Sequence, residues 1–230
     1  MSTSTAAAIL LVGVPLAFNV AFGLLAARFD YPDILRRPTD EVLGRFRQGG
    51  SELVLLWWAF ALSAVLLAPL VVLLSHSLDG ADSTLLAVGA TVGVLAAIVQ
   101  FFGLIRWPFL VPYLARVAAE PDASPARREA VDVVFQAFNR YLGVAVGEHL
   151  GYGLTGAWSV LAGAAITQST VAPSWLGVIG ILVGGLLMLC SLEFVGRFEP
   201  TGWKLAEKLT PIAYIGWSLW LVATGIALVA

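Results

Sequence analysis

Long runs of apolar residues, separated by short polar connections, make up most of this 230-residue chain. Each run is close to the roughly 20 residues that an α-helix needs to cross about 30 Å of hydrocarbon. A single segment in lipid must satisfy its own backbone hydrogen bonds, so we expect each run to be helical. Six runs qualify: roughly 6–27, 53–75, 84–105, 142–167, 175–196 and 211–230. The pattern predicts an all-α membrane protein, with one six-helix bundle over residues 1–230.

Composition supports lipid as the solvent for much of this chain. Hydrophobic residues make up 59% and charged residues 12%, whereas soluble domains are about 25% charged. No basic footprint for nucleic acid is visible. The only cysteine, Cys190, lies inside an apolar run, which favours a small buried side chain over a disulfide or metal cluster. His76 and His149 lie at opposite depths, so we expect no metal and no cofactor.

The basic residues are confined to alternate connections. Five of the 13 Lys and Arg residues follow the first run, five follow the third and three follow the fifth. Positive residues stay in the cytoplasm during insertion, so both termini should face outward. No basic residue precedes Arg28, which favours a retained first span over a secretory signal. We expect a multi-pass protein of the bacterial cytoplasmic (inner) membrane, surrounded by lipid.

The three basic connections begin in a similar way, with Arg, an aromatic residue and Pro at 28–32, 106–108 and 197–200. At a membrane surface, Arg can reach lipid phosphate, the aromatic ring can join the interface, and Pro can end the helix. In the first connection, Val42, Leu43 and Phe46 share one helical face. This spacing predicts a short amphipathic helix on the inner leaflet.

Five polar side chains lie within the apolar runs, although a charge at a helix centre costs about 2.5–3.5 kcal/mol. They are Asn19, Gln100, Glu148, His149 and Glu193. Counted at about 1.5 Å per residue from the inner helix ends, they fall in the cytoplasmic half. We therefore expect a polar pocket that opens toward the cytoplasm or the inner leaflet, with Arg106 near its mouth.

Glu148 is the strongest candidate for chemistry. Tyr152, four residues later, and Tyr141, seven residues earlier, should share its helical face, whereas His149 should not. Glu148 would donate or accept a proton, and His149 would be a second acid–base group or a ligand anchor. Alternatively, both side chains satisfy an internal hydrogen-bond network. Glu193 is expected to pair with Arg197, four residues further on.

Small residues recur every four positions in the fourth run, at Gly143, Gly147, Gly151, Thr155, Ser159 and Gly163. Such a stripe lets helix backbones approach closely. We expect it to pack this helix at the centre of the bundle, although Gly143, Gly147 and Gly151 could also join two copies of the chain.

Three stretches, FDYPDILRRPTDEVLGRFRQGG, RWPFLVPYLA and FNRYLGVAVGEHLGYGLTG, together resemble a family of small bacterial integral-membrane proteins. That family is frequent in actinobacteria and is catalogued as a domain of unknown function. The resemblance covers nearly the whole chain and implies a helical membrane protein of about this size. It brings no established activity and no catalytic residues.

Three functions are compatible with this pattern. The first is a binding protein or transporter for a small lipophilic or anionic molecule, with Asn19, Gln100, Arg106, Tyr152 and Glu193 around Glu148. The second is a membrane-embedded isomerase, lyase or cyclase that uses Glu148 and His149 as acid–base groups. The third is a structural or regulatory subunit whose glycine stripe packs another membrane protein.

Overall fold

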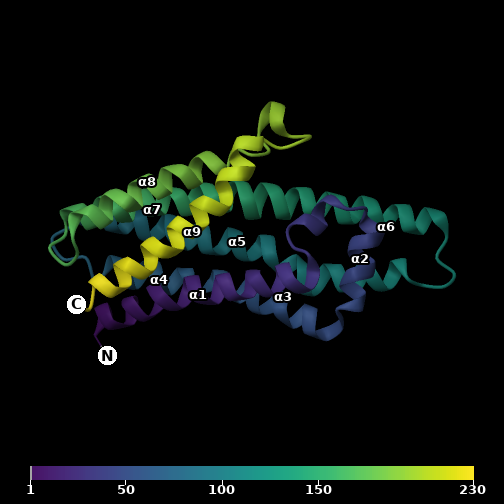
Figure 1. Ribbon diagram of the computed structural model, residues 1–230, viewed down its shortest axis with the longest axis horizontal. Helices are drawn as coiled ribbons and strands as arrows, with labels where there is room; N and C mark the ends of the chain where they lie inside the picture. Colours follow the sequence, from purple (N-terminus) through teal and green to yellow (C-terminus); the bar gives the residue numbers. More distant parts are fainter. Residues whose placement is uncertain (1) are drawn as a thin grey trace.

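The computed structural model describes residues 2–230, and all regular secondary structure in this range is helical. Most helices run lengthwise and pack side by side, and both chain ends lie at the same end of the molecule (Figure 1). In chain order the elements are α1 (Thr3–Phe29), η1 (Asp33–Arg36), α2 (Thr39–Gln48), α3 (Gly50–Val65), α4 (Leu67–Ser75), α5 (Ser83–Ala118), α6 (Pro125–Phe138), η2 (Asn139–Leu150), α7 (Gly151–Gln168), α8 (Ser174–Cys190), η3 (Gly196–Phe198) and α9 (Lys204–Ala227).

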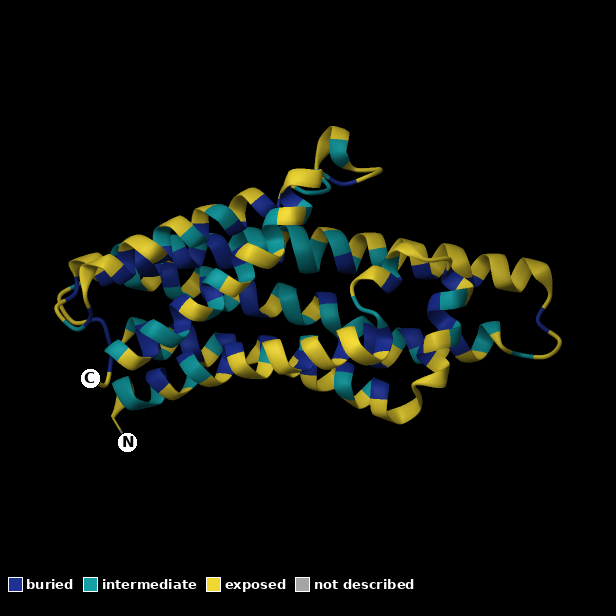
Figure 2. Ribbon diagram, viewed as in Figure 1, coloured by how far each residue is buried: buried dark blue, intermediate teal, exposed yellow. Residues whose placement is uncertain are grey.

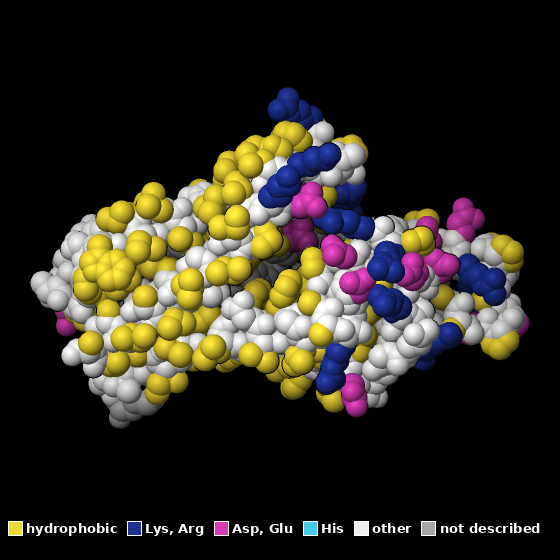
Figure 3. Space-filling view, viewed as in Figure 1, with side chains coloured by type: hydrophobic (Ala, Val, Ile, Leu, Met, Phe, Trp, Pro, Cys, Tyr) yellow, Lys and Arg dark blue, Asp and Glu magenta, His cyan; other side chains and the backbone are white. Residues whose placement is uncertain are grey.

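The two ends of the molecule differ in charge. The end that holds both termini, here called the terminal end, also holds the connections 76–82 and 169–173. On the face shown in Figure 3, Lys and Arg side chains gather in the opposite half, here called the basic end. The connections that carry every basic residue of the chain lie toward this half. Which end faces the cytoplasm stays a prediction.

Four helical segments are long and apolar enough to cross a membrane: Thr3–Phe29, Gly50–Ser75, Ser83–Ala118 and Lys204–Ala227. Many large apolar side chains on the outer faces of the helices are exposed, as a lipid-facing surface requires (Figure 2). These observations support a multi-pass membrane protein.

The other two apolar runs are helical as well. The run at 142–167 lies within a continuous rod, Pro125–Gln168, in which the π-helical η2 joins α6 to α7. The run at 175–196 corresponds to α8, an apolar helix of 17 residues that packs along α7. The count of six spans stays a prediction, because these two segments fall outside the four long apolar helices.

Two hydrophobic clusters follow one another along the bundle. The terminal cluster includes Leu11, Val71, Trp158, Trp217 and Trp220. The aromatic cluster, toward the basic end, is built around Phe29, Phe46, Trp57, Trp107 and Phe135. Partly buried aromatic side chains lie between the two clusters, with Tyr152 and Tyr214 packed against the terminal cluster and Tyr31 against the aromatic cluster.

The sequence predicts that proline ends the helices at the basic connections, and the structure shows this at some of these positions only. The first expected stop is confirmed, since α1 ends at Phe29 and Asp30 adopts a left-handed conformation with φ 61°. The second is wrong, since α5 continues through Pro108 to Ala118. Trp107 and Pro108 are both buried there, and this packing offsets the backbone hydrogen bond that proline removes.

The predicted amphipathic helix exists as α2, but its apolar face does not face lipid. Val42, Leu43 and Phe46 are buried in the aromatic cluster, and α2 crosses between other helices at the basic end (Figure 1). Its apolar face therefore joins the protein core.

Helix α8 ends at Cys190, earlier than the sequence predicts. The hydroxyl of Ser191 donates to the Met188 carbonyl, and the chain then turns so that the Trp203 amide donates to the Glu193 carbonyl at 2.7 Å. The expected pairing of Glu193 with Arg197 along one helix is therefore wrong. Arg197 instead lies over the ring of Phe198, 4.8 Å from its centroid.

Candidate functional site

A polar layer separates the two hydrophobic clusters. Along α5, Ala97 is the last residue of the terminal cluster and Trp107 is the first of the aromatic cluster. Gln100, Gly103 and Arg106 lie between them. Other elements add polar groups at this level, and we use the term polar layer for Tyr31, Arg106, Glu148, Tyr152 and Tyr214.

The π-helical stretch η2 carries Glu148 and lies directly against α5. A Cβ built on Gly103 would lie 2.5 Å from the Cα of Gly147, so the two backbones touch. Any larger side chain at either position would force the helices apart. The two glycines thus hold Glu148 next to α5, in a type of helix that recurs at functional sites.

Arg106 is fixed by contacts within the protein. Its guanidinium donates to the Gly103 carbonyl and to Oδ1 of Asn139, at 2.8 Å for the second bond. The group also lies 5.3 Å from the ring centroid of Trp107. Arg106 therefore contributes a fixed positive charge close to Glu148.

Glu148 has no partner in the described part of the chain. Within residues 2–230 its carboxylate accepts no hydrogen bond and forms no ion pair, and the side chain is only half-buried. The same holds for the hydroxyls of Tyr31, Tyr152 and Tyr214. Figure 3 shows a recess beside α9 with an acidic side chain at its floor. All four residues are half-buried, so each keeps some exposed surface.

Aromatic rings surround these polar groups. The rings of Tyr152 and Tyr214 meet edge to face at 5.2 Å, and Tyr214 stacks on Phe18 at 5.8 Å. Tyr31 packs edge to face on Phe22 at 5.5 Å and on Trp57 at 5.0 Å. The layer thus offers apolar ring faces next to a carboxylate and hydroxyls.

Tyr31, in the connection that follows α1, has a shifted pKa. Burial raises the pKa of its phenol to about 12, and the nearby carboxylate of Glu148 adds to this rise, while Arg106 opposes it. Tyr31 is therefore a neutral phenol at physiological pH and can donate a hydrogen bond.

Three of the predicted site residues link helices instead of facing the recess. Gln100 on α5 donates to the Thr155 hydroxyl at 2.8 Å. Asn19 donates to the Pro15 carbonyl at 2.7 Å and to the Ser218 hydroxyl at 2.9 Å, which joins α1 to α9.

The third is His149, whose Nδ1 lies 2.8 Å from the Ser191 carbonyl and must donate to it, because a carbonyl can only accept. These contacts are those of the internal network that the sequence offered as the alternative for His149.

Two further expectations depended on regular α-helical spacing. Tyr141 was expected on the face of Glu148, but its side chain is 67% exposed whereas Glu148 is half-buried. The π-helical stretch between them changes the number of residues per turn, so the seven-residue spacing does not hold. Glu193 lies in the turn after α8, where its charge is close to that of Glu148.

The small-residue stripe packs inside the bundle, as its spacing predicts. Gly143 lies under the Arg106 guanidinium, Gly147 touches Gly103, and Gly151 faces Gln100. All three glycines contact α5 of the same chain. An association between copies stays a prediction and would need another surface.

A family model described as Domain of unknown function (DUF4386) matches residues 6–225. The chain belongs to this family. No curated protein and no solved structure matches the chain. The resemblance to a family of unknown function is thereby confirmed, whereas a bacterial source stays a prediction.

The DUF4386 match includes every residue of the polar layer, so the candidate site lies within the family domain. Sequence reasoning identified Arg106, Glu148 and Tyr152 but missed Tyr31 and Tyr214. Tyr31 was visible only as part of a proline-containing connection, and Tyr214 as one aromatic residue in an apolar run.

No group of three or more His, Cys, Asp or Glu side chains that could hold a metal ion occurs within residues 2–230. The DUF4386 polar layer combines hydrogen-bonding groups with aromatic ring faces.

Proposed function

We propose that this DUF4386 protein is a binding protein or transporter for a small lipophilic molecule that carries a hydroxyl or amine group. The carboxylate of Glu148 and the hydroxyls of Tyr31, Tyr152 and Tyr214 would hold the polar group of the ligand. In this proposal six helices cross the bacterial inner membrane with both termini outside, and the polar layer lies in the cytoplasmic half.

The absence of partners for these four groups within residues 2–230 is the observation that supports this proposal. Buried polar groups in proteins are nearly always hydrogen-bonded. In the described chain, the only fully buried side-chain nitrogen or oxygen without a partner is Nε1 of Trp57. The groups of the polar layer retain some exposure, so water or a ligand can complete their hydrogen bonds.

The surroundings favour a lipophilic ligand over an anionic one. Arg106 already donates to Gly103 and Asn139, and the carboxylate of Glu148 disfavours a second negative charge. The rings of Phe18, Tyr152 and Tyr214 offer apolar faces that suit hydrocarbon or an organic cation. Catalysis by Glu148 and His149 as a pair gains no support, because no hydrogen bond or ion pair joins the two side chains within residues 2–230 and His149 instead donates to Ser191.

Small molecules that co-purify with the protein provide the test. The full chain and the Glu148→Gln variant would be purified in the same neutral detergent, and their organic extracts compared by mass spectrometry. Glu52→Gln is the matched control, since Glu52 is an exposed acid that pairs with Arg28 at the surface.

We expect at least one species that is enriched with the wild type and the control but lost from Glu148→Gln. Equal elution volumes on size exclusion would show that all three proteins are folded. Identical extracts from the wild type and Glu148→Gln would contradict the proposal.

A further inference from the structure

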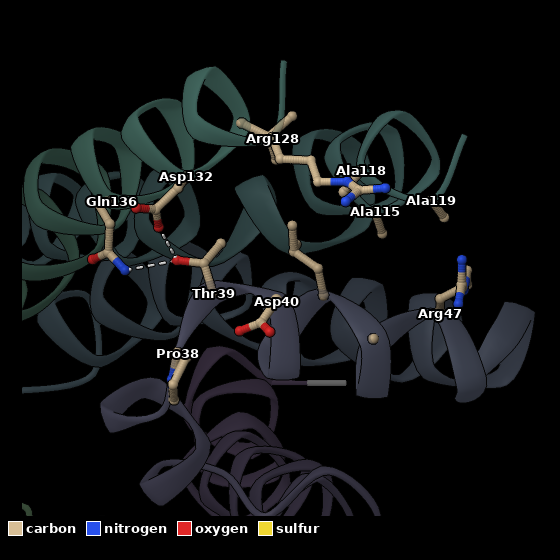
Figure 4. Close-up of a pocket in the computed structure, with 13 residues that line it drawn as sticks. Pro38, Thr39, Asp40, Arg47, Ala115, Ala118, Ala119, Arg128, Asp132 and Gln136 are labelled. Atoms are coloured by element: carbon tan, nitrogen blue, oxygen red, sulfur yellow. Dashed lines mark hydrogen bonds between the residues drawn. The ribbon is translucent and has the colours of Figure 1, made fainter. Parts of the chain in front are cut away.

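A second pocket, separate from the polar layer, lies at the basic end. It has a volume of about 680 Å³ and opens between α2, α6 and the last turns of α5 (Figure 4). This volume is within the range of about 300–1,000 Å³ that small-molecule sites occupy. None of the five polar-layer residues lines it.

Small side chains on α5 create this space. Ala118 and Ala119, at the end of α5, lie three and four positions after Ala115, so both are neighbours of Ala115 on the helix surface, and all three line the pocket. Larger side chains at these positions would fill the gap between α2 and α6. The pocket is therefore a consequence of the alanine surface and not of a loose loop.

Each flanking helix supplies one acid and one arginine to the pocket. Helix α2 contributes Asp40 and Arg47, and helix α6 contributes Arg128 and Asp132. Spacings of seven and four residues place both members on the same face of their helix.

Because the two helices are antiparallel, the arginine of one helix lies toward the same side of the pocket as the arginine of the other. Thr39, at the start of α2, donates to Asp132 and accepts from Gln136 at 2.9 Å. The beginning of α2 thus lies beside the later part of α6. In Figure 4, Arg128 and Arg47 lie toward one side of the pocket, and Asp132 lies toward the other with Thr39 and Gln136.

The charges that line the pocket are exposed and free of ion pairs within residues 2–230, whereas several arginines around them are paired. Arg36, Arg37, Arg45, Arg127 and Arg140 each pair with an Asp or Glu. Arg47, Arg128 and Asp40 do not, and Asp132 bonds only to a hydroxyl. Ligand charges could therefore pair with these groups without breaking an existing bridge.

We propose that this pocket binds a small zwitterion, with a phosphate group between Arg47 and Arg128 and an ammonium group at Asp40 and Asp132. Two guanidinium groups match the several oxygens of a phosphate. A simple anion or a simple cation would meet two like charges in the same pocket, whereas a zwitterion satisfies both ends.

Phosphate and ammonium occur together both in water-soluble phosphoethanolamine and in the headgroup of phosphatidylethanolamine. At 1.5 Å per residue, Ala115–Ala119 lie about 15–21 Å beyond the expected inner end of the third span at residue 105. The headgroup layer adds only about 5–8 Å on each side of the hydrocarbon. This depth favours the water-soluble form.

Isothermal titration of the full-length protein in neutral detergent tests the proposal. The titrants are phosphoethanolamine, ethanolamine, inorganic phosphate and dihexanoyl phosphatidylethanolamine. We expect phosphoethanolamine to bind more tightly than either ethanolamine or phosphate. Tighter binding of the short-chain lipid than of phosphoethanolamine would confirm the zwitterion site and assign it to the lipid headgroup.

Variants show whether binding occurs in this pocket. The double variant Arg47→Gln and Arg128→Gln should weaken phosphoethanolamine binding about tenfold or more, because it removes the charge-assisted hydrogen bonds. Asp40→Asn should reduce the preference for phosphoethanolamine over phosphate. Arg116→Gln is the control, since Arg116 is an exposed arginine near the end of α5 that does not line the pocket.

Two results would overturn the proposal. One is the absence of binding heat for both phosphoethanolamine and the short-chain lipid while the wild type is folded. The other is equal affinity in the double arginine variant and in Arg116→Gln. Phosphate binding as tight as that of phosphoethanolamine, unchanged in Asp40→Asn, would overturn the zwitterionic part.

Discussion

The terminal half and the basic half of this bundle are built on different principles. In the terminal half, α7 and α8 touch through glycines, and a Cβ on Gly184 would lie 2.5 Å from the Gly156 carbonyl oxygen. Two of its buried tryptophans have hydrogen-bond partners, since Trp217 donates to the Ser159 hydroxyl and Trp220 to the Leu176 carbonyl.

The basic half instead contains the aromatic cluster, the charged pocket between α2 and α6, and the polar layer, in which Glu148 and the three tyrosine hydroxyls have no partner within residues 2–230. The terminal half is therefore held by close backbone packing and by hydrogen bonds from buried side chains. Buried polar groups in proteins are nearly always hydrogen-bonded, and in the two functions proposed above ligands would supply the missing partners in this half.

Among the substitutions considered, the largest loss of stability is expected at Trp57, the centre of the aromatic cluster in the basic half. Trp57 is fully buried and stacks on Trp107 with ring centroids 4.4 Å apart. Trp57→Ala should lower the free energy of unfolding by about 3–5 kcal/mol, because it removes a large buried side chain and leaves a cavity.

Denaturant titration in mixed micelles would measure this change. Trp58→Ala is the matched control, since the adjacent side chain is 45% exposed and faces outward. A similar loss in both variants would mean that the aromatic cluster is not the core of the basic half.

The next effect concerns the glycine contact between α7 and α8. Gly184→Ala should cost about 1–3 kcal/mol, because the new methyl group collides with the Gly156 carbonyl and the helices must separate. Gly185→Ala, one residue further along the same helix, has no atom within 4 Å of the new Cβ and should leave stability unchanged. Equal thermal stability of the two variants in detergent would exclude close backbone contact here.

Much of the difference between the terminal half and the basic half can be predicted from the sequence alone. The confinement of all basic residues to alternate connections predicts a basic end, and the four-residue repeat from Gly143 predicts close packing. Both predictions depend only on the spacing of small residues and the positions of charges along the chain, and neither needs knowledge of tertiary contacts. The depth along the helices predicts a polar layer around Glu148, with Arg106 near its mouth, and the four-residue spacing adds Tyr152 to the face of Glu148.

Other features depend on tertiary contacts that no local pattern encodes. The π-helical stretch Asn139–Leu150 changes which side chains share a face, and so Tyr141 and Glu148 separate. The pocket between α2 and α6 needs α5 to continue past Pro108, which the sequence gives as a stop. Tyr31 and Tyr214 are 183 positions apart in the chain, and only tertiary packing brings both within the electrostatic influence of Glu148.

A pH titration can test whether Tyr31 lies in the buried environment that the polar layer implies. Its pKa rises from 10.0 to about 12 in the folded protein, mainly through burial. Below pH 10 the phenol is neutral in both states, so Tyr31 adds no pH dependence. Between pH 10 and 12 the unfolded chain loses this proton and the folded chain keeps it, so stability falls by about 1.4 kcal/mol per pH unit.

Tyr31→Phe lacks the ionising group and should lose less stability over the same interval. The difference between the two titrations isolates Tyr31, because every other ionising group is common to both proteins. Parallel curves for wild type and Tyr31→Phe would mean that the phenol is freely hydrated in the folded state.

The smallest effect should come from the polar link between the two halves. Thr155 accepts a hydrogen bond from Gln100 and is fully buried. Thr155→Val keeps the shape but removes this acceptor. Hydrogen bonds between membrane helices are worth about 0.6 kcal/mol on average and about 1.7 kcal/mol at most, so the loss should fall in that range.

Thr91→Val is the control, because the Thr91 hydroxyl is exposed and bonds only to the Ala87 carbonyl of its own helix. A double-mutant cycle of Thr155→Val with Gln100→Leu would give the coupling energy between these two side chains. A coupling energy near zero would mean that this hydrogen bond does not stabilise the packing of α5 against α7. A coupling energy of the expected size would mean that the hydrogen bond between Gln100 and Thr155 fixes α5 against α7 next to the polar layer.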